Sequence, residues 1–406
     1  MIKKTGILAL AVYLFLVLLS PVLVHAQSEL TILDSSVQAE FPSRLSFNLS
    51  VASDVNITDI RLRYTVDRSG FAQVTSEVYI EFAPSITVDV SWTLEMVKIG
   101  GLPPGSSVDY WWVVKDTSGD RIETAPSRIR FDDNRYSWRS LAEGEVTIYW
   151  YEGNGSFARE IMLSAQQALA RLTEDTGAYL EKPVKLYIYA KPQDLRGAMI
   201  YSQEWTGGRA FTKYGTIAIG IAQDNLSWGK SAIAHELAHL VIGQITLNPY
   251  GDLPTWLNEG LAMYAEGALE SGYVTSLNKA IGEKSLISVH SLSSSFSAFA
   301  EEALLAYAQS YSLVEFLIGN YGQDKMFELL NTFRQGSSYD DALEQVYGLN
   351  MDGLNTLWQD YVTMPATQSI EKKGMHPALT PTLATLAIAL LLTLGLATES
   401  RTWGQD

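Results

Sequence analysis

Three residues of the chain, His235, Glu236 and His239, have the types and spacing of a metal site. On a helix the two histidines lie one turn apart on the same face, so both imidazoles can reach one metal ion. Glu236 then projects beside them, where its carboxylate can accept a proton from a water molecule held there. Only five histidines occur in 406 residues, so a chance match is rare. The pattern therefore predicts a metal centre that activates water.

Such a centre needs a third protein ligand. No further histidine stands at a suitable spacing downstream, and cysteine is absent. Glu259 lies 20 positions after His239, in a segment, Asp252–Glu266, that we expect to open a second helix with Pro254 in its first turn. A glutamate early in a helix can also simply complement the helix dipole. Beside the first helix we favour the ligand role, because two imidazoles and one carboxylate leave Zn²⁺ one open position, as in catalytic sites.

The first helix is predicted from apolar residues at helical spacing. They are Ile233, Leu237, Leu240 and Val241. We expect Ser227 as its N-cap and Gly243 near its end. The residues between His239 and Glu259 leave room for a loop and a second helix packed antiparallel on the first, which would bring the third ligand to the histidines.

These helices belong to a predicted α+β domain over residues 137–368. Three segments are expected as strands, and Ala158–Leu172 as a helix between the first two. The strands are Val146–Tyr151, Val184–Tyr189 and Ala210–Ile221. After them the chain is expected to be almost wholly helical to about Tyr361. Strands followed by helices indicate a small mixed sheet segregated from a helical lobe.

Residues 27–135 show a different pattern, in which apolar and polar residues alternate in short runs separated by turn-forming clusters. The runs include Leu45–Val51, Ile60–Val66 and Tyr110–Val114, and the clusters are Asp67–Gly70 and Pro103–Ser107. Short strands at this spacing predict a β-sandwich. The segment Leu102–Tyr110 resembles the Leu-x-Pro-Gly-x-x-Tyr corner of fibronectin type III domains, modules that usually act as spacers or contact surfaces.

Both ends of the chain carry apolar segments without charge. Residues 1–26 have the layout of a Sec-type signal peptide, with a basic start, an apolar core and a small-x-small cleavage site. Residues 377–398 are long enough to cross a bilayer as a helix, before a short tail at 399–406. An uncleaved N-terminal anchor and a buried terminal helix are the alternatives. We expect an exported protein anchored to the cytoplasmic membrane, with its catalytic domain on the extracytoplasmic side.

The composition excludes several classes of protein. With 45 acidic and 29 basic residues the net charge is −16, which argues against nucleic acid as a partner. The absence of cysteine excludes disulfide scaffolds, iron–sulfur clusters, cysteine-ligated zinc and thiol nucleophiles. His290 and His376 stand in no motif, and we expect the first in a loop and the second beside the membrane. The sequence leaves the oligomeric state open.

The motifs around the histidines resemble those of gluzincin metallopeptidases, the thermolysin and aminopeptidase N superfamily, and most closely bacterial peptidase MA-like domains. The matching residues are His235, Glu236, His239 and the segment Trp256–Ala262. A third match, Tyr307–Leu317, is similar to the helix whose leading tyrosine donates a hydrogen bond to the oxyanion in the aminopeptidase branch. The resemblance implies that role for Tyr307, with Tyr311 as the fallback, and one Zn²⁺ per chain.

The chain also departs from that family. Aminopeptidases carry a Gly-x-Met-Glu-Asn strand whose glutamate binds the free amino group of the substrate, but Arg196–Ile200 lacks both Glu and Asn. Gly207–Ile219 occupies the place of the substrate-facing edge strand, where an extended peptide would pair. An endopeptidase is therefore favoured over an aminopeptidase. Met263 stands where thermolysin has an aspartate that supports its ligands, and Glu266 can orient a histidine instead.

The working hypothesis is a membrane-tethered zinc peptidase acting on peptides or proteins. Zinc held by His235, His239 and Glu259 would lower the pKa of water, and Glu236 would take its proton. The alternative is a catalytically weak or inactive peptidase-like surface protein that acts in adhesion through its β-sandwich. A purely structural zinc is the third option, which the open coordination position disfavours.

Overall fold

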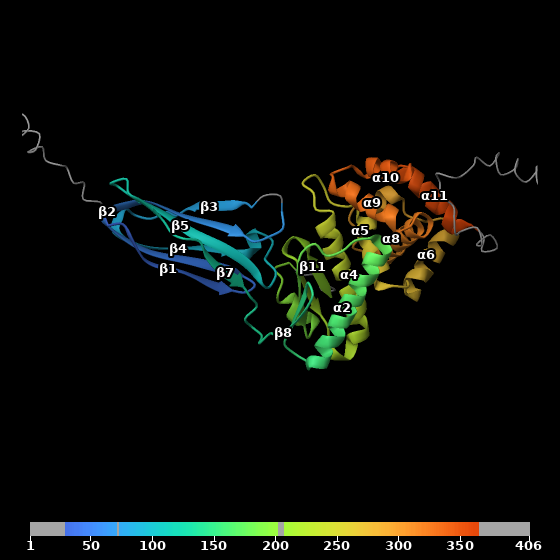
Figure 1. The fold of residues 1–406 in the computed structure, drawn as a ribbon, viewed down its shortest axis with the longest axis horizontal. Coiled ribbons are helices and arrows are strands. Elements are labelled where there is room, and N and C mark those ends of the chain that lie inside the picture. Colours follow the sequence, from blue (N-terminus) through green and yellow to red (C-terminus); the bar gives the residue numbers. More distant parts are fainter. Residues whose placement is uncertain (1–28, 71–72, 202–206, 365–406) are drawn as a thin grey trace, which may run out of the picture.

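The computed structural model describes residues 29–70, 73–201 and 207–364, whose elements form two lobes in chain order (Figure 1). The first lobe is built of strands and the second is α+β, as the sequence predicts. The expected signal peptide, membrane helix and tail lie outside the described residues. Within those three ranges, no helix combines the length and apolar character that crossing a bilayer requires.

The first lobe contains seven strands around one buried core. They are β1 (Thr31–Glu40), β2 (Arg44–Val66), β3 (Thr75–Tyr79), β4 (Ser85–Glu95), β5 (Ser106–Asp116), β6 (Arg121–Glu123) and β7 (Ser127–Phe131), with a 3-10 turn η1 (Met96–Lys98) after β4. The first half of β2 pairs with β1 and β4, and its second half with β3 and β5. Two predicted strands, Leu45–Val51 and Ile60–Val66, are thus halves of one long strand. Its alternating residues bury one face of each half in the shared core.

The second lobe contains a five-stranded mixed sheet in the order β11-β12-β10-β9-β8. Its strands are β8 (Arg139–Glu143), β9 (Val146–Trp150), β10 (Val184–Tyr189), β11 (Gly208–Phe211) and β12 (Thr216–Gly220). The three inner strands are parallel, and both edge strands are antiparallel to their neighbours.

The prediction of one strand over Ala210–Ile221 is wrong. The segment folds back on itself as a hairpin, in which β11 and β12 are joined by the 3-10 turn η2 (Thr212–Tyr214) and Gly215. Gly215 has a positive φ of 59°, a conformation that glycine adopts without steric cost. The reversal makes β11 an edge strand next to the helical part of the lobe.

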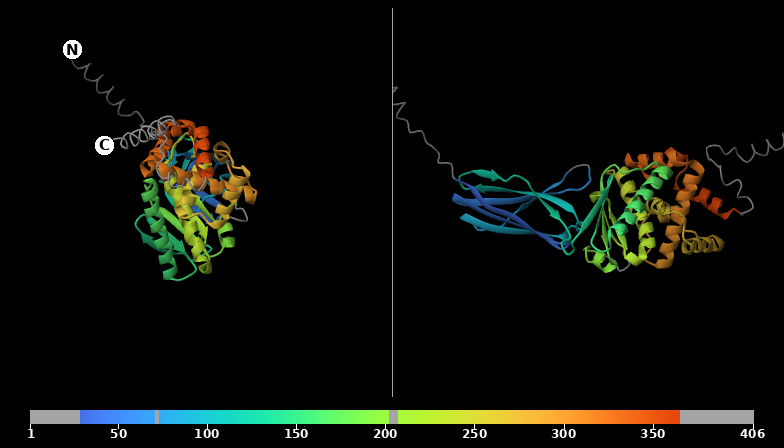
Figure 2. Two further views of the ribbon diagram at one scale, coloured as in Figure 1. Left: turned by 90° about the vertical axis from the view of Figure 1, so that its right-hand side faces the viewer. Right: turned by 60° about the horizontal axis from the view of Figure 1, so that its bottom comes forward.

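Besides η2, eleven helical segments lie among the described residues of the second lobe. They are α2 (Gly155–Thr176), α3 (Pro192–Arg196), η3 (Gln223–Asn225), α4 (Leu226–Ile245), α5 (Thr255–Glu266), α6 (Ser271–Glu283), α7 (Val289–Leu292), α8 (Ala300–Tyr321), α9 (Gln323–Arg334), α10 (Tyr339–Tyr347) and α11 (Met351–Thr363). Helices α2 and α4 cover one face of the sheet with apolar side chains. The remaining long helices pack around α5 and α8 at the end farther from the first lobe (Figures 1 and 2).

The opposite face of the sheet carries aromatic side chains and packs against the first lobe. Its tyrosines are Tyr149, Tyr151, Tyr187 and Tyr189. The last three contact Trp138 or Tyr136, and Tyr149 stacks on Tyr187. The hydroxyl of Tyr189 donates to the buried carboxylate of Asp133 at 2.9 Å, and Lys185 Nζ donates to the Gly105 carbonyl oxygen at 3.0 Å. The two lobes are therefore joined by a buried polar and aromatic interface.

Candidate metal centre

Helix α4 carries His235, Glu236 and His239 on the side that faces away from the apolar core of the sheet. The helix begins at Leu226, so the prediction of Ser227 as N-cap is wrong; Asn225 is in that position and makes no side-chain capping hydrogen bond. Gly243 lies inside the helix, two residues before its end, where an added Cβ would stand 2.9 Å from Thr212 Cγ2. The glycine therefore lets the hairpin turn approach α4.

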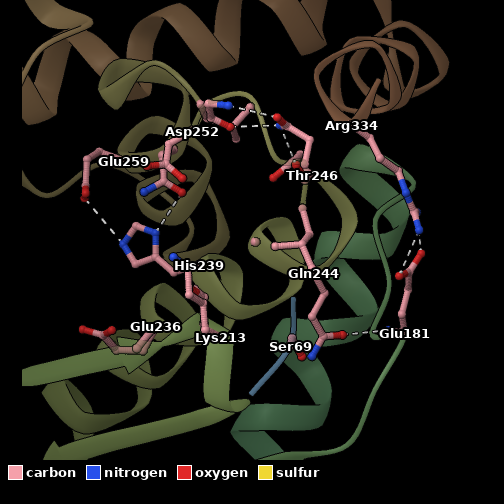
Figure 3. Close-up of a pocket in the computed structure, with 18 of the residues that line it drawn as sticks. Ser69, Glu181, Lys213, Glu236, His239, Gln244, Thr246, Asp252, Glu259 and Arg334 are labelled. Atoms are coloured by element: carbon pink, nitrogen blue, oxygen red, sulfur yellow. Dashed lines mark hydrogen bonds and ion pairs between the residues drawn. The ribbon is translucent and has the colours of Figure 1, made fainter. Parts of the chain in front are cut away.

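Helix α5 packs on α4, as the sequence predicts, but it begins at Thr255, so Pro254 is in the N-cap position and not in the first turn. It brings Glu259 to the two histidines from the other side of the cleft (Figure 3). On its opposite side, Gly260 lies against α8, so closely that a Cβ there would collide with the Ser310 carbonyl oxygen. This contact fixes the position of α5, and with it the position of the carboxylate.

The three predicted ligands converge. The Nε2 atoms of His235 and His239 are 3.1 Å apart, and Glu259 Oε2 lies 3.5 Å from the first and 3.6 Å from the second. Two atoms about 2.1 Å from a tetrahedral zinc ion lie about 3.4 Å apart. The spacing of these three atoms therefore fits the ligand set of a zinc ion.

The outer nitrogens of both rings are anchored, which fixes the orientation of each ring. His235 Nδ1 lies 2.8 Å from Glu266 Oε1, and His239 Nδ1 lies 3.2 Å from Asn258 Oδ1. Both partner atoms are oxygens that accept from Nδ1, so each ring turns its Nε2 toward the centre, where it can offer a lone pair to a cation that displaces its proton. The sequence analysis predicted that Glu266 can orient a histidine, but it did not predict a role for Asn258. The only feature of the sequence that points to Asn258 is its position directly before Glu259.

The electrostatics of the centre favour a positive charge between these groups. Burial lowers the pKa of His235, but hydrogen bonds to Glu259 and Glu266 outweigh this effect and raise that pKa to about 10. Burial raises the pKa of Glu259, and the two histidines reverse the effect and lower it to about 2. A divalent cation supplies the positive charge that this donor set attracts.

Glu236 is not part of the ligand group and lies beside β11. A Cβ on Gly208 would stand 2.9 Å from its Oε1, and the backbone of Ala210 partly offsets the effect of burial on its pKa. Burial is the main cause of a raised pKa for Glu236. A carboxylate with a raised pKa is a better proton acceptor for water than an ordinary one.

A cleft of about 1310 Å³ opens over the centre, and His235, Glu236, His239, Glu259 and Tyr307 all line it. Burial and the charge of Glu259 raise the pKa of Tyr307, which keeps its hydroxyl protonated. The fallback residue, Tyr311, is not among the described residues that line the cleft, and its ring contacts Tyr264 instead. Of the two tyrosines, Tyr307 is therefore the one that lines the cleft.

The other segments singled out in the sequence lie as follows. β11 is an edge strand whose Gly208, Arg209 and Ala210 line the cleft. Arg196–Ile200 forms no strand; it ends α3 and approaches the first lobe, where Ile200 lies beside Gly101. His290, expected in a loop, lies in the one-turn helix α7 and pairs with Asp352 at 3.2 Å. His376 lies outside the described residues.

Comparisons with known proteins agree with this arrangement at the level of the domain. Residues 164–364 match the family model of the Peptidase MA superfamily. No curated protein sequence matches the chain.

Three solved structures show the range of similar proteins. The M1 zinc metallopeptidase from Deinococcus radiodurans is 14% identical, with 81% of this chain and 92% of that chain covered and a TM-score of 0.35. A carbohydrate-binding module of family 56, a beta-1,3-glucan binding domain, is 16% identical over 24% of this chain and 96% of its own, with a TM-score of 0.16. OgpA from Akkermansia muciniphila is 8% identical over 25% of this chain, with a TM-score of 0.19, and the chain spans 27% of its length.

Proposed function

We propose that the Peptidase MA superfamily domain formed by residues 164–364 is a zinc-dependent peptidase. The observation that carries the proposal is the convergence of His235 Nε2, His239 Nε2 and Glu259 Oε2 within 3.1–3.6 Å of one another, with both outer ring nitrogens anchored. The set leaves one position open toward the cleft, which suits a catalytic ion better than a structural one.

A bound zinc ion would polarise the scissile carbonyl and lower the pKa of the attacking water. Glu236 accepts the proton of that water and then passes it to the leaving amine, a role supported by its raised pKa and its place beside the histidines. The hydroxyl of Tyr307 donates a hydrogen bond to the oxyanion that forms on the carbonyl. Its location in the cleft supports this role.

An endopeptidase fits the cleft better than an aminopeptidase. The exposed edge of β11 can pair with an extended peptide on both sides of the scissile bond. The segment that would supply an amine-binding glutamate in an aminopeptidase, Arg196–Ile200, carries no acidic residue and contacts the first lobe.

The Glu236→Gln variant tests the proposal. The substitution leaves the three ligands in place, so we expect one zinc per chain by elemental analysis but a loss of casein hydrolysis of at least about 100-fold. A chelator should abolish the wild-type activity, and added zinc should restore it. Glu301→Gln, on the exposed start of α8, is the matched control and should keep full activity. Wild-type hydrolysis by Glu236→Gln would overturn the assignment of the base.

We also propose that the peptidase is exported and tethered to the cytoplasmic membrane, with residues 1–26 as signal peptide and 377–398 as the membrane helix. The domains would then be 27–135, a fibronectin type III-type sandwich, and 137–368, the peptidase. The pairing of β2 with β1 and β4 on one side and with β3 and β5 on the other supports the sandwich. Recovery of the full chain in the soluble fraction after cell disruption would contradict the tether.

A further inference from the structure

The loop that follows β2 in the first lobe reaches into the cleft of the second lobe. Arg68, Ser69 and Gly70 line the cleft together with the metal centre. The Ser69 backbone N–H donates to the Lys213 carbonyl oxygen at 2.6 Å, and Lys182 Nζ donates to Ser69 Oγ at 3.3 Å. Figure 3 shows Ser69 and Lys213 on the same side of the cleft floor. The first lobe therefore forms part of the cleft wall.

The position of this loop is fixed by the interface between the lobes. Asp133 accepts hydrogen bonds from Arg135 and Tyr189, and Lys185 reaches the Gly105 carbonyl oxygen. Gly105 has a positive φ, and a Cβ there would collide with the Tyr187 hydroxyl. Such close and polar contacts leave little room for the lobes to slide against each other. The loop with Arg68, Ser69 and Gly70 therefore has a fixed position in the wall of the cleft.

Three cationic side chains lie on or beside this loop, next to the acidic Asp67 and Glu181. Arg68, Lys182 and Lys213, here called the cationic region, are all exposed and line the cleft. Another cation in the cleft, Arg334, is neutralised by Glu181 at 2.6 Å. Among the described residues, neither Arg68 nor Lys213 forms an ion pair. In a chain with a net charge of −16, unneutralised cations gathered in one cleft mark where a negative ligand is favoured.

The distance from the metal centre to the cationic region can be counted along the hairpin. Gly208 lies against Glu236, β11 ends three residues later at Phe211, and Lys213 lies in the turn that follows. A strand rises about 3.3 Å per residue, so a peptide extended along β11 covers about 10 Å before it reaches this turn. Its side chains therefore meet the cationic region about three to five residues from the scissile bond.

We infer that the cationic region is a subsite for acidic side chains of the substrate, formed jointly by Arg68 of the first lobe and Lys213 of the second. This inference rests on the proposed peptidase function. The substrate class is then peptides with Asp or Glu about three to five residues from the cleaved bond. The first lobe acts in this way as a specificity element.

A binding experiment tests the subsite without turnover. The probes are a fluorescein-labelled peptide of alternating Gly and Glu and its Gln analogue, each titrated with the zinc-loaded Glu236→Gln protein and followed by fluorescence anisotropy. We expect the Glu peptide to bind about tenfold more tightly at low salt, with the preference shrinking as salt rises. Adding Arg68→Ala and Lys213→Ala should reduce the preference to about twofold or less.

The matched control removes two exposed cations outside the cleft, Arg159→Ala and Lys279→Ala, and so changes the net charge equally. It should keep the tenfold preference. The inference is overturned if the Glu peptide shows no preference, if the preference survives loss of Arg68 and Lys213, or if the control loses it as well.

Cleavage of a proteome-derived peptide library separates this inference from the peptidase function. Wild-type cuts should be enriched in Asp or Glu about three to five residues from the bond, and Arg68→Ala with Lys213→Ala should lose the enrichment while still cutting peptides without acidic residues. Cuts without enrichment would refute the subsite alone. If the zinc-loaded wild type cuts no peptide, the peptidase function fails, and the anisotropy result still decides the subsite.

Discussion

At the scale of single residues, the centre depends on side chains that do not touch the metal position. Glu266 holds His235 Nδ1 at 2.8 Å, which orients the ring and makes Nε2 the free donor atom. Glu266→Gln keeps the shape of the side chain but removes its charge, and it can present an N–H to the ring. We expect zinc affinity to fall about 10- to 100-fold, measured by competition with a chromogenic chelator.

The exposed Glu270, just beyond the end of α5, offers the matched control. Glu270→Gln changes the charge by the same amount without contacting the histidines and should leave zinc affinity unchanged. Equal zinc affinity in the wild type and Glu266→Gln would show that the contact with His235 does not orient the ring.

The residues of the centre differ in how far the sequence could predict them. His235 and His239 are fixed by helical spacing, and Glu259 follows from the scarcity of other ligands, so their convergence could be anticipated. Asn258 could not, because its contact with His239 depends on how α5 is rotated against α4. The choice between Tyr307 and Tyr311 also required the structure, since both stand on α8 one turn apart and the packing of that helix decides which one enters the cleft.

At the scale of elements, the place of Glu259 depends on how closely α5 packs on α8. Gly260→Ala would put a Cβ against the Ser310 carbonyl oxygen and 2.7 Å from Val314 Cγ2. Overpacking of this kind costs about 1–3 kcal/mol, which exceeds the helix-propensity gain of about 1 kcal/mol. We expect a net loss in the free energy of unfolding, measured by urea denaturation.

Gly319, on α8, is the control because a Cβ added there would have no neighbouring atom within 4 Å. Gly319→Ala should leave stability unchanged or raise it by up to about 1 kcal/mol. If Gly260→Ala were equally stabilising, the two helices would have freedom to separate, and the close contact would not determine where Glu259 lies.

The prediction of secondary structure succeeded where the hydrophobic pattern of a segment is sufficient to define it. It failed where the structure depends on a turn or on neighbouring segments. The strands Val146–Tyr151 and Val184–Tyr189 were found almost to the residue because each is apolar along its length. The hairpin over β11 and β12 was missed because a short 3-10 turn interrupts an otherwise extended pattern. β8 is short and mostly exposed, so its sequence carries no hydrophobic signal.

At the scale of the whole molecule, the two lobes share one interface. No local pattern in the sequence predicts this interface. Asp133 is almost fully buried and accepts hydrogen bonds from Arg135 of its own segment and from Tyr189 of the sheet. Removing one partner of such a network leaves the remaining polar and charged groups buried without a hydrogen-bond partner or an opposite charge. The loop at Ser69 is attached to Lys213 across the same junction, so the cleft depends on this interface as well.

We therefore expect Asp133→Ala to lower the free energy of unfolding by about 3 kcal/mol and to loosen both lobes together. Hydrogen exchange followed by mass spectrometry should show faster exchange in β5 and β7 of the first lobe and in β10 of the second. Asp132→Ala is the control, because its ion pair with Arg130 at 2.9 Å is half exposed and is worth about 1 kcal/mol or less. Faster exchange confined to one lobe would mean that the two lobes unfold independently, and that the cationic region is not held in place by the interface.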